Sequence, residues 1–171
     1  MESLELVERL AAAEIGATYN QYAAAPHLCH RLARYLDSRA CAEVVLVGEA
    51  AGYRGARVSG IPFTSERQLT GDGPGEATAT IVHRVLAELA LEDDVVLWNV
   101  VPTHPGTATS NRSPTRAEVT AGLPFAREVA RGRRVLAVGR IAEAALGAPY
   151  VRHPSHGGAA AFRETLAACL A

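Results

Sequence analysis

The chain has 171 residues, of which 49% are hydrophobic and 20% are charged, a composition typical of a globular protein and not of a disordered one. This length predicts a single domain over residues 1–171, with a core large enough to form without disulfides or metal. The formal net charge is −1 and all 17 basic residues are arginine, so bulk charge does not indicate nucleic acid and no lysine can form a Schiff base.

The cysteines and the N-terminal residues bear on the cellular compartment. Cys29, Cys41 and Cys169 show no paired pattern, which favours a reducing environment. The first five residues, MESLE, are acidic, and no apolar run approaches the length of a membrane span. We therefore expect a cytoplasmic protein with no membrane partner.

The first third of the chain predicts two helices followed by a buried strand. Apolar residues recur at helical spacing over residues 3–14 and 28–39, and residues 44–47 form a run of β-favouring apolar residues. Glu49 is expected just beyond this strand, in a loop that contains Gly48 and Gly52. His27 and its neighbours Cys29 and His30 lack a second group of ligands, so we expect no metal site there.

Strands and helices alternate in the rest of the chain. Strands are predicted over residues 95–101, 133–139 and 150–152, and helices over residues 76–91, 114–130, 141–146 and 159–170. Ser113 is the predicted N-cap of the second of these helices, with Pro114 in its first turn. The alternation predicts an α/β fold, a three-layer αβα sandwich around a four-stranded parallel sheet.

Polar side chains lie at the ends of three predicted strands. Because parallel strands share one carboxyl edge, Glu49, Asn99 and His153 are expected to meet in one crevice. Glu49 taken alone is equally compatible with a solvated turn. Asn99 interrupts an apolar strand, so its amide is either a structural tie or a recognition group, because an unpaired buried amide costs about 1 to 3 kcal/mol.

Several chemistries lack their motifs in this sequence. The phosphate loop, the Gly-x-Ser-x-Gly nucleophile elbow, the dinucleotide fingerprint and the zinc deaminase signature are all missing. What remains at the crevice is a carboxylate, an amide, an imidazole and the aromatic Phe63. This set suits a planar heterocycle, with Phe63 stacked on it, Asn99 reading its edge and His153 stabilising its charge.

These motifs resemble the uracil-DNA glycosylase superfamily in order and spacing. The resemblance covers about residues 43–165 and lies in GEAAG (48–52), GIPF (60–63), NVV (99–101) with SNRSP (110–114), and HPS (153–155). It is closest to the family 4 branch, whose first motif reads Gly-Glu-Ala-Pro-Gly and whose last begins His-Pro-Ser. Each motif is weak alone, but four in the right order are specific.

The resemblance implies the fold of that superfamily and a role for each matching residue. Phe63 would stack on an extruded uracil, and Asn99 would read its O4 and N3–H edge. His153 would stabilise the developing uracil anion through O2, and Glu49 would order or polarise the attacking water. The loop of Ser155, His156, Gly157 and Gly158 would press into the duplex. Arg112, together with Arg54, Arg57 and Arg152, flanks the motifs, and each is either a phosphate contact or a solvated surface charge.

The departures from the family pattern also carry expectations. Ala50 stands where family 1 enzymes carry a catalytic aspartate, so Glu49 would have to serve instead. Gly52 stands where family 1 has a tyrosine that excludes the methyl group of thymine, which leaves Tyr53 as a candidate for that role. Thr103 replaces a cysteine of the family 4 iron-sulfur cluster, and the chain has three cysteines in all, so no cofactor is expected. A bulky wedge residue is missing at His156 and the glycines after it.

The expected activity is that of a monofunctional uracil-DNA glycosylase, which releases uracil and leaves an abasic site without strand cleavage, because lysine is absent. Its partner would be uracil-containing DNA, single-stranded or U·G mispaired, and the protein would be a monomer. Three alternatives remain open. One is a noncatalytic lesion-binding module, which Ala50 favours. The others are a glycosylase for another deaminated base, such as hypoxanthine, and an N-ribosidase that acts on free nucleosides.

Overall fold

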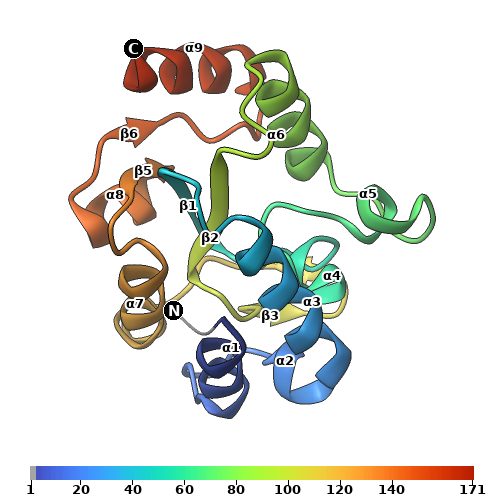
Figure 1. Ribbon diagram of the computed structural model, residues 1–171. Helices are drawn as coiled ribbons and strands as arrows, with labels where there is room; N and C mark the ends of the chain where they lie inside the picture. The colour runs from blue at the N-terminus through green and yellow to red at the C-terminus, as the bar shows by residue number, and fades with distance from the viewer. Residues whose placement is uncertain (1–2) are drawn as a thin grey trace.

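A parallel sheet with helices on both faces forms the centre of the computed structural model, which describes residues 3–171 (Figure 1). Strands β1 (Val44–Ala50), β2 (Val95–Val101), β5 (Arg134–Val138) and β6 (Tyr150–Val151) lie in the order β2-β1-β5-β6, and each adjacent pair is parallel. The predicted α/β fold with a four-stranded parallel sheet is therefore confirmed. Residues 1 and 2 of the acidic N-terminal stretch lie outside the described residues.

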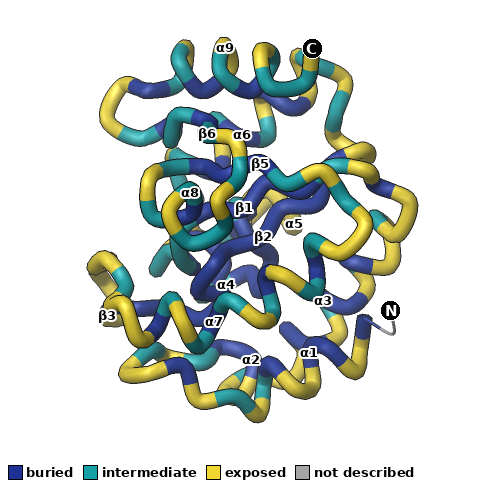
Figure 2. The backbone as a smooth tube through the Cα atoms, turned by 90° about the vertical axis from the view of Figure 1, so that its left-hand side faces the viewer, coloured by how far each residue is buried: buried dark blue, intermediate teal, exposed yellow. Residues whose placement is uncertain are grey.

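The two faces of the sheet bury two separate groups of side chains because the strands are apolar on both sides. Val47 and Trp98 face the layer of α1 (Ser3–Ala12), α3 (Pro26–Ser38), α7 (Arg116–Val129) and α8 (Arg140–Leu146). Leu46 and Leu97 face α6 (Ala77–Glu88) and α9 (Ala159–Leu170). In Figure 2 the central strands are buried along their length, whereas the surrounding helices alternate between buried and exposed turns.

The short elements differ from the sequence prediction. Among the described residues three helices, not two, precede β1, because Asn20 caps the additional α2 (Gln21–Ala24) by accepting the N–H groups of Tyr22 and Ala23. The segment after β1 contains α4 (Ala56–Ser59) and α5 (Glu66–Thr70), and β3 (Gly106–Thr107) pairs with β4 (Ser110–Asn111) in a hairpin. Strand β1 also continues to Ala50, so Glu49 lies inside the strand and not beyond it.

The predicted start of α7 is wrong by two residues. Thr115, not Ser113, is the N-cap, and Pro114 precedes the helix. The Thr115 hydroxyl accepts the Glu118 N–H at 3.2 Å, and the Glu118 carboxylate accepts the Thr115 N–H at 2.8 Å. This reciprocal capping box satisfies two helix-end donors at once, which a cap at Ser113 would not.

Within residues 3–171, no helix combines the length and the apolar character needed to cross a membrane.

Candidate active site

A small pocket lies at the carboxyl edge of the sheet, where the predicted site residues come together. Its volume is about 110 Å³, and it is lined by Glu49, Ala50, Gly52, Gly55, Ala56, Phe63, Glu76, Thr78, Asn99, Asn111 and His153. Liquid water occupies about 30 Å³ per molecule, so the pocket holds a few waters or one small ring, well below the ~300 Å³ of a drug-sized site.

Asn99 is a buried amide without a protein partner. It lies in β2 directly beside Gly48 of β1, and only 3% of its surface is exposed. No hydrogen bond from its side chain to another group occurs within residues 3–171, although the side chain lines the pocket. Its polar atoms are not completely enclosed by protein, unlike the unpartnered atoms of Gln21, Arg39 and Trp98, so they are open to the pocket. The lack of a protein partner argues against a structural tie, and recognition of a ligand stays a prediction.

The Phe63 ring fits close to Gly48 and Asn99 because position 48 has no side chain. A Cβ atom at position 48 would lie 2.2 Å from Phe63 Cζ and 2.9 Å from Asn99 Oδ1, so any side chain there would displace the ring. The Phe63 backbone has a left-handed φ of 52°, a conformation that costs a non-glycine residue about 1 to 3 kcal/mol. The buried Ser59 hydroxyl maintains it by donating to the Thr64 carbonyl at 2.6 Å.

His153 presents a fixed tautomer to the pocket. Its Nδ1 accepts the backbone N–H of Ser155 at 3.2 Å and lies 2.8 Å from the Ser155 hydroxyl. A nitrogen that accepts cannot also carry the proton, so the neutral ring carries its proton on Nε2. Burial, and then the charges of Arg152 and His156, lower the pKa of His153. At neutral pH the ring is therefore an uncharged donor.

Glu49 is a half-buried carboxyl at the end of β1. Burial raises its pKa, because the charged form loses hydration, and the side chain of Ser113 limits the rise by bonding to it. A carboxylate that is partly desolvated is a better proton acceptor than one in water. This environment suits a group that holds and polarises a water molecule.

Three polar residues that line the pocket, Glu76, Thr78 and Asn111, were not predicted as site residues from the sequence. Glu76 caps α6, and its two carboxylate oxygens accept the N–H groups of Thr78 and Ala79, each at 3.0 Å. Asn111 lies in β4, and its Oδ1 accepts the Tyr53 N–H at 2.9 Å. The available signals were the position of Glu76 before a helical pattern and the presence of Asn111 in SNRSP.

A wider groove of about 410 Å³ adjoins the pocket. The two share Glu49, Ala50, Gly52, Thr78, Asn111 and His153, and the groove adds Ala51, Pro105, Arg112, Ser113, Ser155 and His156. Ser155 and His156 thus lie beside the pocket, whereas Gly157 and Gly158 form the turn behind them. A Cβ atom on Gly158 would lie 2.4 Å from the His153 carbonyl oxygen, so this turn needs glycine to hold His153 in place.

Two of the predicted site residues have other contacts. Arg112 donates to both carboxylate oxygens of the buried Glu118, at 2.7 and 2.8 Å, so its charge is already paired inside the protein. Tyr53 does not line the pocket, and its ring lies under the Arg54 guanidinium at 5.5 Å. A phosphate contact by Arg112 and exclusion of thymine by Tyr53 stay predictions.

The hairpin beside the groove is fastened by His104, which is completely buried. Its Nδ1 lies 2.7 Å from the Ala51 carbonyl oxygen, and its Nε2 lies 2.7 Å from the Thr107 carbonyl oxygen. His104 therefore connects the residue after β1 to the β3–β4 hairpin.

The cysteines do not fit an iron-sulfur cluster of the family 4 kind. Cys29 is in α3, Cys41 follows α3 and Cys169 is in α9. The hydroxyl of Thr103 lies 2.6 Å from that of Thr18, where the pattern would need a thiolate. Among residues 3–171, no three His, Cys, Asp or Glu side chains are grouped closely enough to hold a metal ion.

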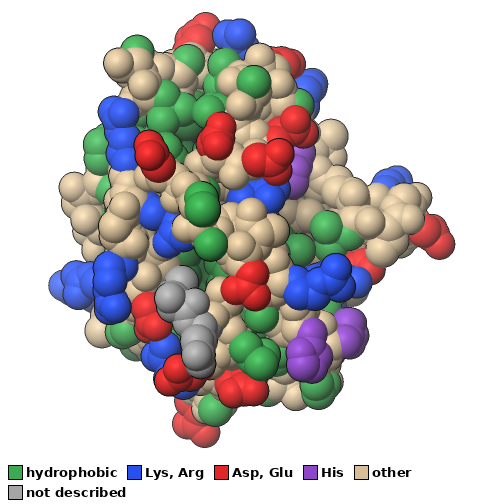
Figure 3. All heavy atoms as spheres, viewed as in Figure 1, with side chains coloured by type: hydrophobic (Ala, Val, Ile, Leu, Met, Phe, Trp, Pro, Cys, Tyr) green, Lys and Arg blue, Asp and Glu red, His purple; other side chains and the backbone are tan. Residues whose placement is uncertain are grey.

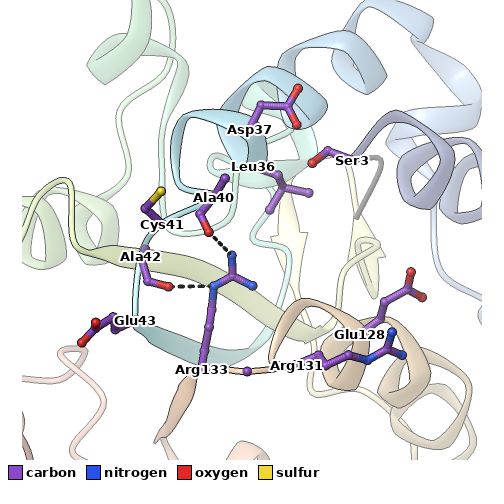
Figure 4. Close-up of a pocket in the computed structure, with 11 residues that line it drawn as sticks. Ser3, Leu36, Asp37, Ala40, Cys41, Ala42, Glu43, Glu128, Arg131 and Arg133 are labelled. Atoms are coloured by element: carbon purple, nitrogen blue, oxygen red, sulfur yellow. Dashed lines mark hydrogen bonds between the residues drawn. The ribbon is translucent and has the colours of Figure 1, made fainter.

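A separate hollow of about 450 Å³ lies at the opposite, amino edge of the sheet (Figure 4). The Arg133 guanidinium donates there to the carbonyl oxygens of Ala42 at 3.0 Å, Ala40 at 3.3 Å and Val129 at 2.7 Å. These bonds tie the connection between α3 and β1 to the end of α7. The arginine already has its partners, so we read this hollow as structural.

Comparison with known proteins identifies the family of this protein independently of the site geometry. The family model described as the Uracil DNA glycosylase superfamily matches residues 37–168. A comparison with curated proteins gives no match. Among solved structures, the chain is similar to wild-type SMUG2 from Pedobacter heparinus, with a TM-score of 0.69 and 13% identity over 99% of this chain and 97% of that one. The structural likeness shows a shared fold, and the family match spans most of the chain and all four motifs at the pocket, so the protein belongs to the uracil DNA glycosylase superfamily.

Proposed function

We propose that the protein is a monofunctional DNA glycosylase that extrudes deoxyuridine from DNA and hydrolyses its N-glycosidic bond. The observation that carries this proposal is the unpartnered amide of Asn99 beside the Phe63 ring, in a pocket of about 110 Å³. Membership of the superfamily supports action on DNA.

Base recognition follows from the chemistry of these two side chains. Extrusion costs a few kcal/mol of unstacking, less for a U·G mispair, and stacking on Phe63 returns about 1 to 3 kcal/mol. The Asn99 amide would donate to O4 and accept from N3–H of uracil. Cytosine presents an acceptor and a donor in the opposite order, so it would leave two buried groups unpaired at about 1 to 3 kcal/mol each.

Bond cleavage uses His153 and Glu49. As the C1′–N1 bond breaks, its electron pair moves onto the base, and the Nε2–H of neutral His153 donates to O2 of the uracil anion. A donor aimed at developing charge in this way is worth about 3 to 4 kcal/mol. Glu49 holds a water, which attacks C1′ of the oxocarbenium sugar and gives up its proton to the carboxylate.

Glu49 is the better base of the two carboxylates that line the pocket. Both oxygens of Glu76 already accept N–H groups from α6, so they are less available to hold a water molecule. Glu49 is half-buried with a raised pKa, so it accepts a proton more readily. Glu49 therefore activates the attacking water, which Ala50 cannot do because it has no carboxylate.

The test is release of uracil from a single-stranded and a U·G-mispaired oligonucleotide, followed by alkali to reveal abasic sites. Glu49→Gln and His153→Ala should each lower the single-turnover rate by about 10²- to 10³-fold. Matched controls are Glu164→Gln and His27→Ala, which replace exposed residues outside the pocket and should leave the rate unchanged. Strand cleavage without alkali would contradict a monofunctional enzyme.

Substrate choice is tested with Asn99→Asp, which should gain cytosine release because the carboxyl accepts from the amino group of cytosine. Full discrimination against cytosine in this variant would show that Asn99 does not recognise the base.

Two other outcomes of these assays would favour an alternative function. Binding of uracil-containing DNA without base release would indicate a lesion-binding module, and hydrolysis of free deoxyuridine at a rate insensitive to salt would indicate a nucleoside hydrolase.

A further inference from the structure

A second groove, of about 440 Å³, adjoins the base pocket between α5 and the first turn of α6. It is lined by Arg54, Ser65, Arg67, Gln68, Pro74, Gly75, Glu76, Ala77 and Thr80. It shares Glu76 with the base pocket and shares no lining residue with the groove at Ser155 and His156. The base pocket therefore lies between the two grooves, and the first turn of α6 runs beside them.

The groove between α5 and α6 has two arginines and one carboxylate in its lining, so positive charge is in excess. Arg54 and Arg67 are exposed, and neither takes part in the ion pairs formed within residues 3–171. Arg67 Nε donates to the Gly73 carbonyl at 3.0 Å, which fixes the side chain and leaves its terminal amino groups free of hydrogen bonds among the described residues. The one carboxylate in the lining, Glu76, is engaged by the N–H groups of α6.

The excess of positive charge is confined to this groove and does not extend over the surrounding surface. In Figure 1 the α5 segment stands out from the body of the protein beside α6. The same face in Figure 3 mixes acidic and basic side chains without a large field of one sign, in keeping with a net charge of −1. In the other groove, the arginine is paired with Glu118. Attraction for an anion therefore comes from Arg54 and Arg67 and not from the whole molecule.

We infer that this groove holds the sugar-phosphate backbone of the DNA strand on one side of the extruded nucleotide, with Arg54 and Arg67 against its phosphates. The inference rests on the proposed function, because a nucleotide whose base fills the pocket has a phosphate on each side. The strand must leave the pocket in two directions, and the two grooves are the hollows that adjoin it. Guanidinium groups bind phosphate oxygens through two parallel N–H donors.

The first experiment measures binding of a fluorescent single-stranded oligonucleotide without uracil, by anisotropy over a range of salt concentrations. The double variant Arg54→Ala/Arg67→Ala should bind about tenfold more weakly. Each lost phosphate contact on a single strand lowers the slope of log Kd against log salt by about 0.7, so the slope should fall by about 1.4. Arg127→Ala is the matched control, because Arg127 is exposed, lines none of these hollows and forms no ion pair within residues 3–171.

The second experiment locates the contact along the strand. Uracil-containing oligonucleotides carry one neutral methylphosphonate linkage, placed at successive positions 5′ or 3′ of the uracil. On one side of the uracil the wild-type protein should lose affinity at a neutral linkage and the double variant should lose nothing further, because the two changes remove the same contact. Additive losses at every position, on both sides of the uracil, or an equal effect of Arg127→Ala would overturn the inference.

The outcomes separate this inference from the proposed function. If no base is released but the salt slope and the methylphosphonate pattern hold, the glycosylase assignment falls and the backbone groove stands. If base release is normal and the arginine pair has no effect on binding, the groove falls alone. An RNA oligonucleotide of the same sequence is the third arm, and tighter binding of RNA would overturn the assignment to DNA.

Discussion

Gly48 controls the pocket through the side chain that it lacks. Replacement by alanine would place a Cβ atom 2.2 Å from Phe63 Cζ and 2.9 Å from Asn99 Oδ1, closer than either contact allows. Gly48→Ala should therefore reduce uracil release by at least about tenfold, the loss that corresponds to ~1.4 kcal/mol of base stacking. Full activity of Gly48→Ala in a single-turnover assay would contradict this account.

The pH dependence of base release follows from the two groups that we propose take part in catalysis, Glu49 and His153. Glu49 must be ionised, and burial raises its pKa above 4.5, so its active form is gained as pH rises through that raised value. His153 must be neutral, and its pKa lies below 6.5, so its active form is also gained as pH rises. Both ionisations therefore lower kcat/KM on the acid side, below about pH 6.5.

A plot of log kcat/KM against pH should approach a slope of about 2 on the acid limb for the wild type. Glu49→Gln should retain a slope of about 1, from His153 alone, at a reduced rate. An unchanged acid limb in that variant would mean that Glu49 does not titrate in the reaction.

At the scale of elements, the start of α7 is fixed by a buried carboxylate. Hydrogen bonds from Arg112, then from the backbone of Thr115, lower the pKa of Glu118 to about 2. A lowered pKa stabilises the fold above the unfolded value of about 4.3, and that stability is lost as pH falls toward 2.

The expected contribution of Glu118 is about 3 kcal/mol at pH 7, because one pKa unit corresponds to ~1.4 kcal/mol. Urea unfolding at pH 7, 4 and 2.5 should show this loss in the wild type. Glu118→Gln should be less stable at pH 7 and should lose less between pH 4 and 2.5. Parallel pH curves for the variant and the wild type would refute the assignment, and Glu164→Gln serves as the exposed control.

The long elements were predictable from the sequence because their side-chain pattern alone specifies them. The strand over residues 95–101 has the predicted bounds. All seven of its residues are buried, and Asn99 is the one residue among them that is not hydrophobic. The helices α2, α4 and α5 have four or five residues, too few to show a period. Long-range bonds such as that from Tyr22 Oη to the Gly60 carbonyl fix them, and sequence spacing does not reveal such bonds.

The site was predictable where it depends on the sheet. Glu49, Asn99 and His153 meet because parallel strands end at one edge, and Phe63 was placed by its motif. Glu76, Thr78 and Asn111 were missed because they reach the pocket from the start of a helix and from a hairpin. For the α7 cap, the sequence did hold the deciding signal, which is Glu118 three residues after Thr115 and not after Ser113.

At the scale of the whole molecule, the surface offers little apolar area for self-association. Within residues 3–171 the large hydrophobic side chains that are substantially exposed are Leu4, Tyr19 and Leu69, each at 40 to 42% exposure, and they lie on separate segments. Stable interfaces need a contiguous patch of several hundred Å². We expect a monomer of 18.0 kDa in sedimentation equilibrium at micromolar concentration, and a mass near twice that value would contradict it.

The β3–β4 hairpin is attached at its base, so its tip could change in length while the pocket stays as it is. His104 and Asn111 fasten the base of the hairpin to the segment that follows Glu49, whereas Ala108 and Thr109 at its tip are exposed. Residues could be inserted at the tip without moving either fastening point. The length of the hairpin is thus open to engineering, or to divergence between homologues, independently of the pocket.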